Sequence, residues 1–288
     1  SDVAPRLMAA DLTVGNLESP LSSRGAKVPN KSYTFQGTPL GADALASAGF
    51  DVVSVANNHV LDFGPVALSD TLANLDAKQI AYAGAGRTRT DAWRAATVDA
   101  AGNSVACLAF SDIVPPGFAA DADSPGIADS RKTMDEVAAA VKAAAASHDF
   151  VLVSMHWGDE YQYDANDEQV RDAHRLVNAG ADMVLAHHPH VIQGIERYKG
   201  ALIAYSLGDF VFDHDLRSTG ESFILEAELG PAGVGEATCT PIYCSDTNGR
   251  PEYIHGKEAA VVTKRVRTLS KRLGTKVTVV GDVARVER

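Results

Sequence analysis

The chain has 288 residues, of which 45% are hydrophobic and 22% charged, a composition typical of a folded globular protein. Asp and Glu total 37 against 26 Lys and Arg, and the net charge of −11 disfavours nucleic acid and anionic lipid as partners. Because no apolar stretch approaches the ~20 residues of a membrane helix, we expect a chain that is soluble as given. The 3 cysteines match neither a disulfide framework nor a zinc spacing, so we expect reduced thiols, and the compartment, cytoplasm or cell envelope, stays open.

Short apolar runs alternate with amphipathic segments through most of the chain, which predicts strands and helices in layers. Residues 1–10 indicate the tail of a helix, so we expect a leader, an anchor or a first strand to precede them. Strands are expected at Asp11–Gly15, Asp51–Val55, Ile80–Ala83, Ser104–Ser111, Phe150–His156, Met183–Ala186 and Leu202–Ser206. Helices are expected at Thr38–Ala48, Pro65–Lys78, Thr133–Ser147 and Asn166–Ala179, and Gly49 and Gly180 follow two of them as stop signals.

The pattern changes after residue 206, where turn residues separate shorter apolar runs. We expect antiparallel strands of a second sheet at Ser222–Leu229, Ala237–Tyr243 and Val261–Thr263. The segment Pro115–Arg131 is rich in Pro, Gly, Asp and Ser, and it is either a lid or a surface excursion. No linker divides the chain, so we expect a single domain over residues 1–288.

Three histidines in four positions form the strongest local signal. The motif His187-His188-Pro189-His190 directly follows the strand expected at residues 183–186. Imidazoles at a strand end are able to converge on a divalent metal, and the proline between His188 and His190 favours a tight turn. The alternative is a polar loop whose histidines cap neighbouring groups, and we favour the metal site.

Other strand ends carry ligand types of the same kind. His156 ends an apolar run, and Glu160 beside it is a second ligand, a hydrogen-bond partner of His156 or the acid at a helix start. Glu18 follows the first strand, where its carboxylate is able to bridge two cations. Taken singly, each has a plainer interpretation as a rim histidine or a surface carboxylate.

The motif Asn57-Asn58-His59 follows the strand at residues 51–55. Asn58 offers a hard oxygen ligand, and the adjacent His59 is placed to face a substrate as an acid or oxyanion partner. The asparagine pair is also an ordinary turn signal. Asp209 follows the strand at residues 202–206, and it either supports the site as a carboxylate or belongs to a turn.

Four strand ends therefore offer metal ligands, and open α/β sheets assemble sites at the carboxyl ends of their strands. Imidazoles and carboxylates together suit manganese, zinc and iron alike. No glycine-rich phosphate loop, nucleophile elbow or thiol next to a histidine competes with this interpretation. The expected ligands are Glu18, Asn58, His156, His188 and His190.

Five motifs occur in the order of a known family: Ala10–Glu18, Ala56–His59 with Asp62–Gly64, His156–Glu160, His187–His190 and Tyr205–Phe210. The sequence resembles the CapA/PgsA capsule-synthesis proteins, also called poly-gamma-glutamate synthesis proteins, whose domain is related to calcineurin-like metallophosphoesterases. The resemblance covers about residues 10–213, which leaves residues 214–288 for second-sheet strands and a helix.

This resemblance implies an α/β fold, a four-layer αββα sandwich of the metallophosphatase type, with one or two divalent ions at the strand ends. It implies that Glu18 bridges the ions, that the other four expected residues ligate them, and that His59 lies beside the reacting group. We add Glu160 and Asp209 to His59 as candidate catalytic residues. Two departures from the family are the missing first strand ending in Gly-Asp before Asp11, and Asp209 in place of an asparagine.

The leading hypothesis is a metal-dependent hydrolase that acts on a gamma-glutamyl or other peptide amide, or on a phosphoester, in the synthesis or processing of a capsule polymer. The alternative is a non-catalytic assembly or polymer-handling module that retains the fold. We expect a small-molecule or peptide-like polymer substrate, no nucleic acid, and membrane-associated capsule-synthesis partners. Neither the oligomeric state nor the metal follows from the sequence.

Overall fold

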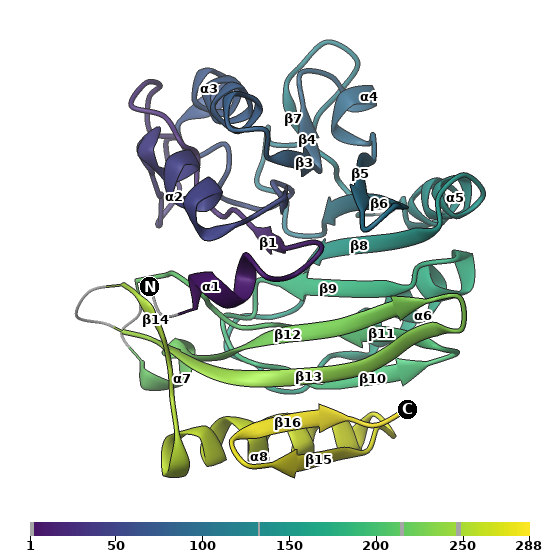
Figure 1. The fold of residues 1–288 in the computed structure, drawn as a ribbon. Coiled ribbons are helices and arrows are strands. Elements are labelled where there is room, and N and C mark those ends of the chain that lie inside the picture. The colour runs from purple at the N-terminus through teal and green to yellow at the C-terminus, as the bar shows by residue number, and fades with distance from the viewer. Residues whose placement is uncertain (1–2, 132, 214–215, 246–248) are drawn as a thin grey trace. The chain divides into compact units, whose positions relative to one another are not determined.

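The computed structural model describes residues 3–131, 133–213, 216–245 and 249–288. Within these residues the chain forms two compact units. The N-terminal unit is Ala4–His156, and the C-terminal unit is Trp157–Arg288 together with Val3. Figure 1 shows the order of the helices and strands along the chain. The single domain expected over residues 1–288 is not tested by this division and stays a prediction.

The N-terminal unit contains two sets of strands that run mostly in parallel. In the first set the order is β1-β2-β3, with both pairs parallel. In the second set β6 pairs in parallel with β8 and antiparallel with β5, while β4 and β7 form a separate short pair. The bounds are β1 Val14–Asn16, β2 Val52–Ser54, β3 Ala81–Ala83, β4 Ala85–Gly86, β5 Ala96–Ala100, β6 Asn103–Ser111, β7 Gly126–Ile127 and β8 Phe150–His156.

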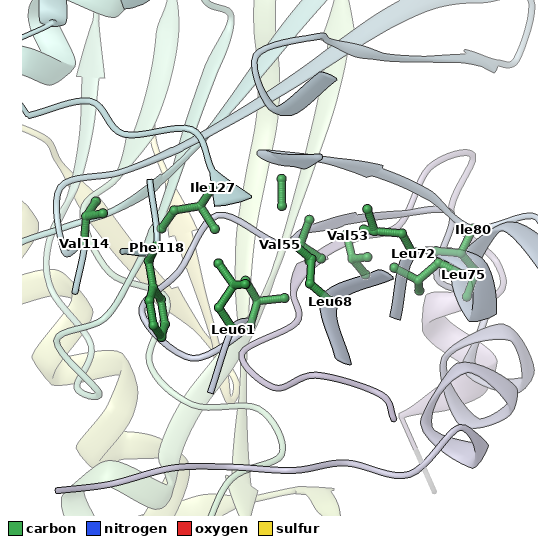
Figure 2. Close-up of a cluster of buried hydrophobic side chains, with 12 residues drawn as sticks. Val53, Val55, Leu61, Leu68, Leu72, Leu75, Ile80, Val114, Phe118 and Ile127 are labelled. Atoms are coloured by element: carbon green, nitrogen blue, oxygen red, sulfur yellow. The ribbon is translucent and has the colours of Figure 1, made fainter. Parts of the chain in front are cut away.

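Apolar residues at helical spacing build the core of this unit. In α3 (Gly64–Ala77), Leu68, Leu72 and Leu75 recur at three and four residues, so they lie on one buried face. Figure 2 shows these leucines in one cluster with Val53 of β2, with Val55 directly after β2, and with Val114 and Phe118 of the loop between β6 and β7. The other helices are α1 Ala4–Leu7, α2 Leu40–Ala48, α4 Arg89–Ala92 and α5 Met134–Ala145.

The C-terminal unit combines a small mixed sheet with a long antiparallel one. β11 pairs in parallel with β9 and antiparallel with β10. The long hairpin β12–β13 continues through β16 to β15, and β14 pairs with the other end of β13. The bounds are β9 Met183–His187, β10 Ile195–Tyr198, β11 Ala201–Ala204, β12 Glu221–Gly230, β13 Gly233–Cys244, β14 Pro251–Tyr253, β15 Val277–Val280 and β16 Val283–Val286, with helices α6 Asp167–Ala179, α7 Arg217–Gly220 and α8 Gly256–Arg272.

One element differs in type from the sequence-based expectation. Val261–Thr263, predicted as a strand, lies in the middle of α8, which packs against β13, β15 and β16 (Figure 1). The prediction was wrong because three adjacent β-branched residues favour a strand locally. The longer pattern decides instead, since Val262, Val266 and Leu269 recur at helical spacing and are buried.

The other expectations hold at the level of elements. The predicted α/β class, with strands in more than one sheet, is confirmed; the order of the four layers joins both units and stays a prediction. Gly49 and Gly180 end α2 and α6 in the left-handed conformation, with φ of 84° and 116°, as their stop signals predicted. The segment Pro115–Arg131 contains the short strand β7, which pairs with β4.

Candidate metal-ligand clusters

Three of the predicted ligands come together within the N-terminal unit. Asn58 Oδ1 lies 2.9 Å from His156 Nε2, and Glu18 Oε1 lies 3.4 Å from the same nitrogen. Glu18 follows β1, Asn58 follows β2, and His156 is the last residue of β8. His156 is 1% and Asn58 9% exposed, and the Glu18 side chain is 11% exposed. One imidazole, one amide oxygen and one carboxylate, shielded from water, suit a divalent ion.

Asn57 ties the ends of β1 and β2 together. Its Nδ2 donates to the carbonyl oxygen of Leu17 (2.8 Å) and to Asn16 Oδ1 (3.1 Å), while its Oδ1 accepts the backbone N–H of His59. Asn16 Nδ2 in turn donates to Glu18 Oε2 at 2.8 Å. These bonds fix where Glu18 points, because Asn57 is fully buried and its amide has no water to exchange with.

His59 is held by a buried ionic group. Its Nδ1 lies 2.7 Å from Asp62 Oδ2 and 2.9 Å from Lys31 Nζ, and Lys31 Nζ lies 2.6 Å from Asp62 Oδ1. The Phe35 N–H also donates to Asp62 Oδ2, and the Phe35 ring lies 4.2 Å from the imidazole, centroid to centroid. Burial lowers the pKa of Lys31, because desolvation of the ammonium outweighs the attraction of the Asp62 carboxylate. The contacts with Asp62 and Lys31 both involve Nδ1 of the imidazole, and neither involves Nε2.

Sequence reasoning missed Lys31, Phe35 and Asn16. Lys31 and Phe35 lie between β1 and α2, where no period of apolar residues predicts an element. The only signal in the sequence is Asp62, three residues after His59, which is the spacing of a carboxylate that reaches back to an imidazole in a turn.

The remaining predicted residues gather within the C-terminal unit. The ligand atoms of Glu160, His188 and His190 all lie within 4.8 Å of one another. His190 Nδ1 lies 2.9 Å from Asp209 Oδ1, so that carboxylate orients the ring. The two histidines are buried and Glu160 is exposed. Glu160 precedes α6, which begins at Asp167, so its interpretation as the acid at a helix start is wrong.

The turn that carries the two histidines is strained. His188 has φ of 99° and His190 has φ of 56°, in the left-handed region that favours glycine. Such residues cost of order 1–3 kcal/mol each and persist where the surroundings hold them. Here the Tyr161 N–H donates to the Pro189 carbonyl oxygen at 2.8 Å, and the Trp157 N–H donates to that of His187. The backbone therefore tolerates an unfavourable conformation that presents two imidazoles.

The donors of each cluster fit a divalent cation. They are imidazole nitrogens and carboxylate or amide oxygens, with no thiolate, as manganese, zinc and iron accept. Asp209 Oδ2 is buried and makes no hydrogen bond to any described residue, so a nearby cation would compensate its desolvation. Each cluster lies within one of the two units.

Comparison with known proteins supports the motif-based resemblance. The family model described as bacterial capsule synthesis protein PGA_cap matches residues 1–214. The chain belongs to the PGA_cap family. The predicted resemblance to CapA/PgsA capsule-synthesis proteins is thereby confirmed.

Curated relatives of this PGA_cap protein are longer than the chain. It is 35% identical to PGA biosynthesis protein CapA of Bacillus subtilis (strain 168), over 86% of this chain and 66% of the relative. It is 37% identical to a probable polyglutamine synthesis accessory protein of Mycobacterium tuberculosis, over 77% of this chain and 60% of the relative. The chain thus spans less than two thirds of these relatives' own length.

Among solved structures, the PGA_cap chain resembles a 5'-nucleotidase precursor from Thermus thermophilus. The TM-score is 0.39 and the identity 15%, and the match covers 76% of this chain and 42% of the other. Within the described residues, no helix is both long enough and apolar enough to cross a membrane.

Proposed function

We propose that this PGA_cap protein is a metal-dependent hydrolase that cleaves an amide bond of a glutamate-containing capsule polymer during its synthesis or processing. The observation that carries the proposal is the approach of Glu18 and Asn58 to His156 Nε2 within the N-terminal unit, next to a His59 held by Asp62. The names of the relatives, a PGA biosynthesis protein and a polyglutamine synthesis accessory protein, support a polymer of this kind.

One or two divalent ions, manganese, zinc or iron, are the proposed cofactor. The residues that would hold them are the five predicted ligands of the two clusters, Glu18, Asn58, His156, His188 and His190. When bound, such an ion polarises a carbonyl oxygen and lowers the pKa of a water molecule.

The side chains around the ligands supply orientation and proton transfer. Asp62 Oδ2 lies 2.7 Å and Lys31 Nζ 2.9 Å from His59 Nδ1, so Nε2 is the nitrogen that we assign to protonation of the leaving amine. Asp209 orients the ring of His190. Glu160 is the exposed member of its cluster, and we assign it to contact with the substrate.

Metal content is the first test of this proposal. Elemental analysis of the protein purified without chelator should find manganese, zinc or iron near stoichiometry. The double variants Asn58→Ala/His156→Ala and His188→Ala/His190→Ala should both lose it. His255→Ala, at an exposed histidine outside both clusters, should retain it. Absence of metal from the unaltered protein, even after these ions are added, would overturn the proposal.

Turnover is the second test. The metal-loaded protein should release amine from gamma-glutamyl peptides, and His59→Gln should abolish that release while keeping the metal. If the protein hydrolysed phosphoesters and no gamma-glutamyl peptide, the proposed substrate would be a phosphoester and not an amide. Full metal occupancy without turnover on either class would instead favour a non-catalytic assembly or polymer-handling module.

A further inference from the structure

Two aromatic rings approach the imidazole of His190 from separate segments of the C-terminal unit. The ring centroid of Phe212 lies 4.8 Å from that of His190, and the ring centroid of Tyr161 lies 6.3 Å from it. Tyr161 precedes α6 in the sequence, and Phe212 precedes α7. The proposed function gives neither ring a role. Together with the neighbouring Val211, the two rings form a surface that we call the apolar rim.

The apolar rim is more open to solvent than packing around His190 requires. His190 is 8% exposed, so the groups around it already cover it. In contrast, Tyr161 is 51% and Val211 62% exposed. Single exposed apolar residues are ordinary on protein surfaces, but these two flank the same pair of buried histidines in their rim segments. Exposed apolar area is unfavourable in water, and a ligand that covers it gains that free energy on binding.

The backbone of the rim is anchored on both segments. The Tyr161 N–H donates to the Pro189 carbonyl oxygen at 2.8 Å, in the turn between the two histidines. Tyr161 has φ of 63°, in the left-handed region, and such a conformation persists where its surroundings hold it. The buried Cys244 thiol of β13 donates to the Phe212 carbonyl oxygen at 3.6 Å. Because the backbone is held in advance, less entropy is lost when a ligand settles against the rings.

The charges beside the rim select the kind of group that it accepts. Four carboxylates lie within two residues of its members in the sequence: Asp159, Glu160, Asp209 and Asp213. They disfavour an anionic group, and the negative faces of the aromatic rings act in the same direction. A cationic group would be repelled by the metal ions proposed for the adjacent histidines. An uncharged apolar group meets neither repulsion.

The position of Glu160 connects the rim with the substrate. Glu160 directly precedes Tyr161, and its ligand atom lies within 4.8 Å of those of His188 and His190. We assigned its exposed carboxylate to contact with the substrate, so a ligand that reaches Glu160 also comes next to the Tyr161 ring.

We infer that the apolar rim binds an uncharged apolar group of the substrate, such as an aliphatic side chain next to the bond that is cleaved. This inference deepens the proposed function, and it rests on that function in treating the group as part of a substrate. It makes Tyr161 a specificity-determining residue, because the rim distinguishes substrates by the charge of this group.

The test measures binding without turnover. Ligand-observed NMR follows three probes, the N-acetyl methylamides of leucine, glutamate and lysine, titrated with the protein as purified and after addition of manganese. The leucine probe should bind at least about fivefold more tightly than the other two, because its side chain buries apolar area. Equal binding of the three probes, binding of none, or tightest binding of a charged probe would overturn the inference.

Variants of the rim show whether its side chains cause the preference. Tyr161→Ala/Val211→Ala should bind the leucine probe at least about fivefold more weakly, whereas Tyr161→Phe should retain the preference because it keeps the ring. The matched control Tyr33→Ala/Val280→Ala removes the same side chains at positions that are 75% and 57% exposed, and it should bind like the unaltered protein. Circular dichroism establishes that each variant is folded. Equal weakening in both double variants would overturn the inference.

Metal content separates a binding role of the rim from a structural one, and the inference from the proposed function. Tyr161→Ala/Val211→Ala should retain metal and show a raised KM at unchanged kcat on a gamma-glutamyl-leucine peptide. Loss of metal would mean that the rim only supports the histidines, and it would overturn the inference. A protein without metal that still prefers the leucine probe would contradict the proposed hydrolase and leave the rim standing. A metal-loaded hydrolase without this preference would do the reverse.

Discussion

Lys31 and Asp62, which are far apart in the sequence, together position the imidazole of His59. The carboxylate of Asp62 is fully buried, and burying a charge is costly unless a partner and hydrogen bonds compensate it. Lys31 Nζ at 2.6 Å and the N–H of Phe35 at 2.7 Å supply that compensation. The same contacts hold the His59 imidazole through Nδ1, so the stability of this group and the orientation of the histidine depend on one another.

Replacement of Lys31 by methionine tests this dependence. Lys31→Met leaves the Asp62 carboxylate buried with one partner fewer, and we expect the free energy of unfolding to fall by about 3 kcal/mol. Urea unfolding followed by circular dichroism measures it. Lys27→Met, at an exposed position nearby in the sequence, should change it by less than about 0.5 kcal/mol. A Lys31→Met protein as stable as this control would show that the ion pair contributes nothing.

At the scale of elements, Gly84 lets strands of the N-terminal unit approach closely. It lies between β3 and β4 with φ of 94°, and a Cβ there would meet Ala56 Cβ at 2.5 Å and Ala109 Cβ at 2.8 Å. Ala56 directly precedes the Asn57-Asn58-His59 motif, and Ala109 belongs to β6. The absence of a side chain at Gly84 therefore sets the packing beneath the residues that follow β2.

Alanine substitution at two glycines separates this packing from backbone strain. Gly102 also has positive φ, 82°, but a Cβ there would have no neighbour within 4 Å. Gly102→Ala should cost about 1 kcal/mol for the left-handed backbone, and Gly84→Ala about 3 kcal/mol or more, since steric overlap adds to it. Chemical denaturation of both variants checks the difference. Equal losses would mean that the neighbours of Gly84 move aside freely.

At the scale of the whole molecule, the cysteines report on the integrity of both units. Cys107 lies in the N-terminal unit and Cys239 and Cys244 in the C-terminal unit, and all are free and buried. Burial raises the pKa of the Cys107 thiol to about 12, and burial also raises the pKa of Cys239 and Cys244. The folded protein therefore keeps these thiols protonated and covered, as expected for structural cysteines.

Thiol reactivity gives a pH-dependent prediction. At pH 8 the native protein should react with none of its thiols in a disulfide-exchange assay, and urea should release all 3. Because the folded pKa of Cys107 is about 12 against ~8.5 unfolded, its contribution to stability is complete below pH ~8.5 and is lost as the pH rises toward 12. Unfolding at pH 8 and pH 10 should show this decline, which Cys107→Ala should reduce. Stoichiometric labelling of the native protein at pH 8 would contradict the burial of the thiols.

Features that depend on neighbouring residues could be predicted from the amino-acid sequence. Apolar runs and helical spacing located β8, β9, α3 and α6, and polar residues at strand ends pointed to Glu18, Asn58 and His156, whose side chains lie together in the structure. These signals are local, because strand ends and apolar faces follow from periods of two and 3.6 residues. The prediction that all five ligands act on the same ions remains to be tested by the metal analysis.

Contacts between side chains that are distant in the sequence became known from the folded structure. Lys31 reaches Asp62 across 31 positions, and Asp209 reaches His190 across 19, in contacts that no local period encodes. The structure also corrected Val261–Thr263 from strand to helix, because burial of one face over all of α8 outweighs the preference of three β-branched residues. Long-range contacts arise from the packing of whole elements, so they become visible only when those elements have been placed.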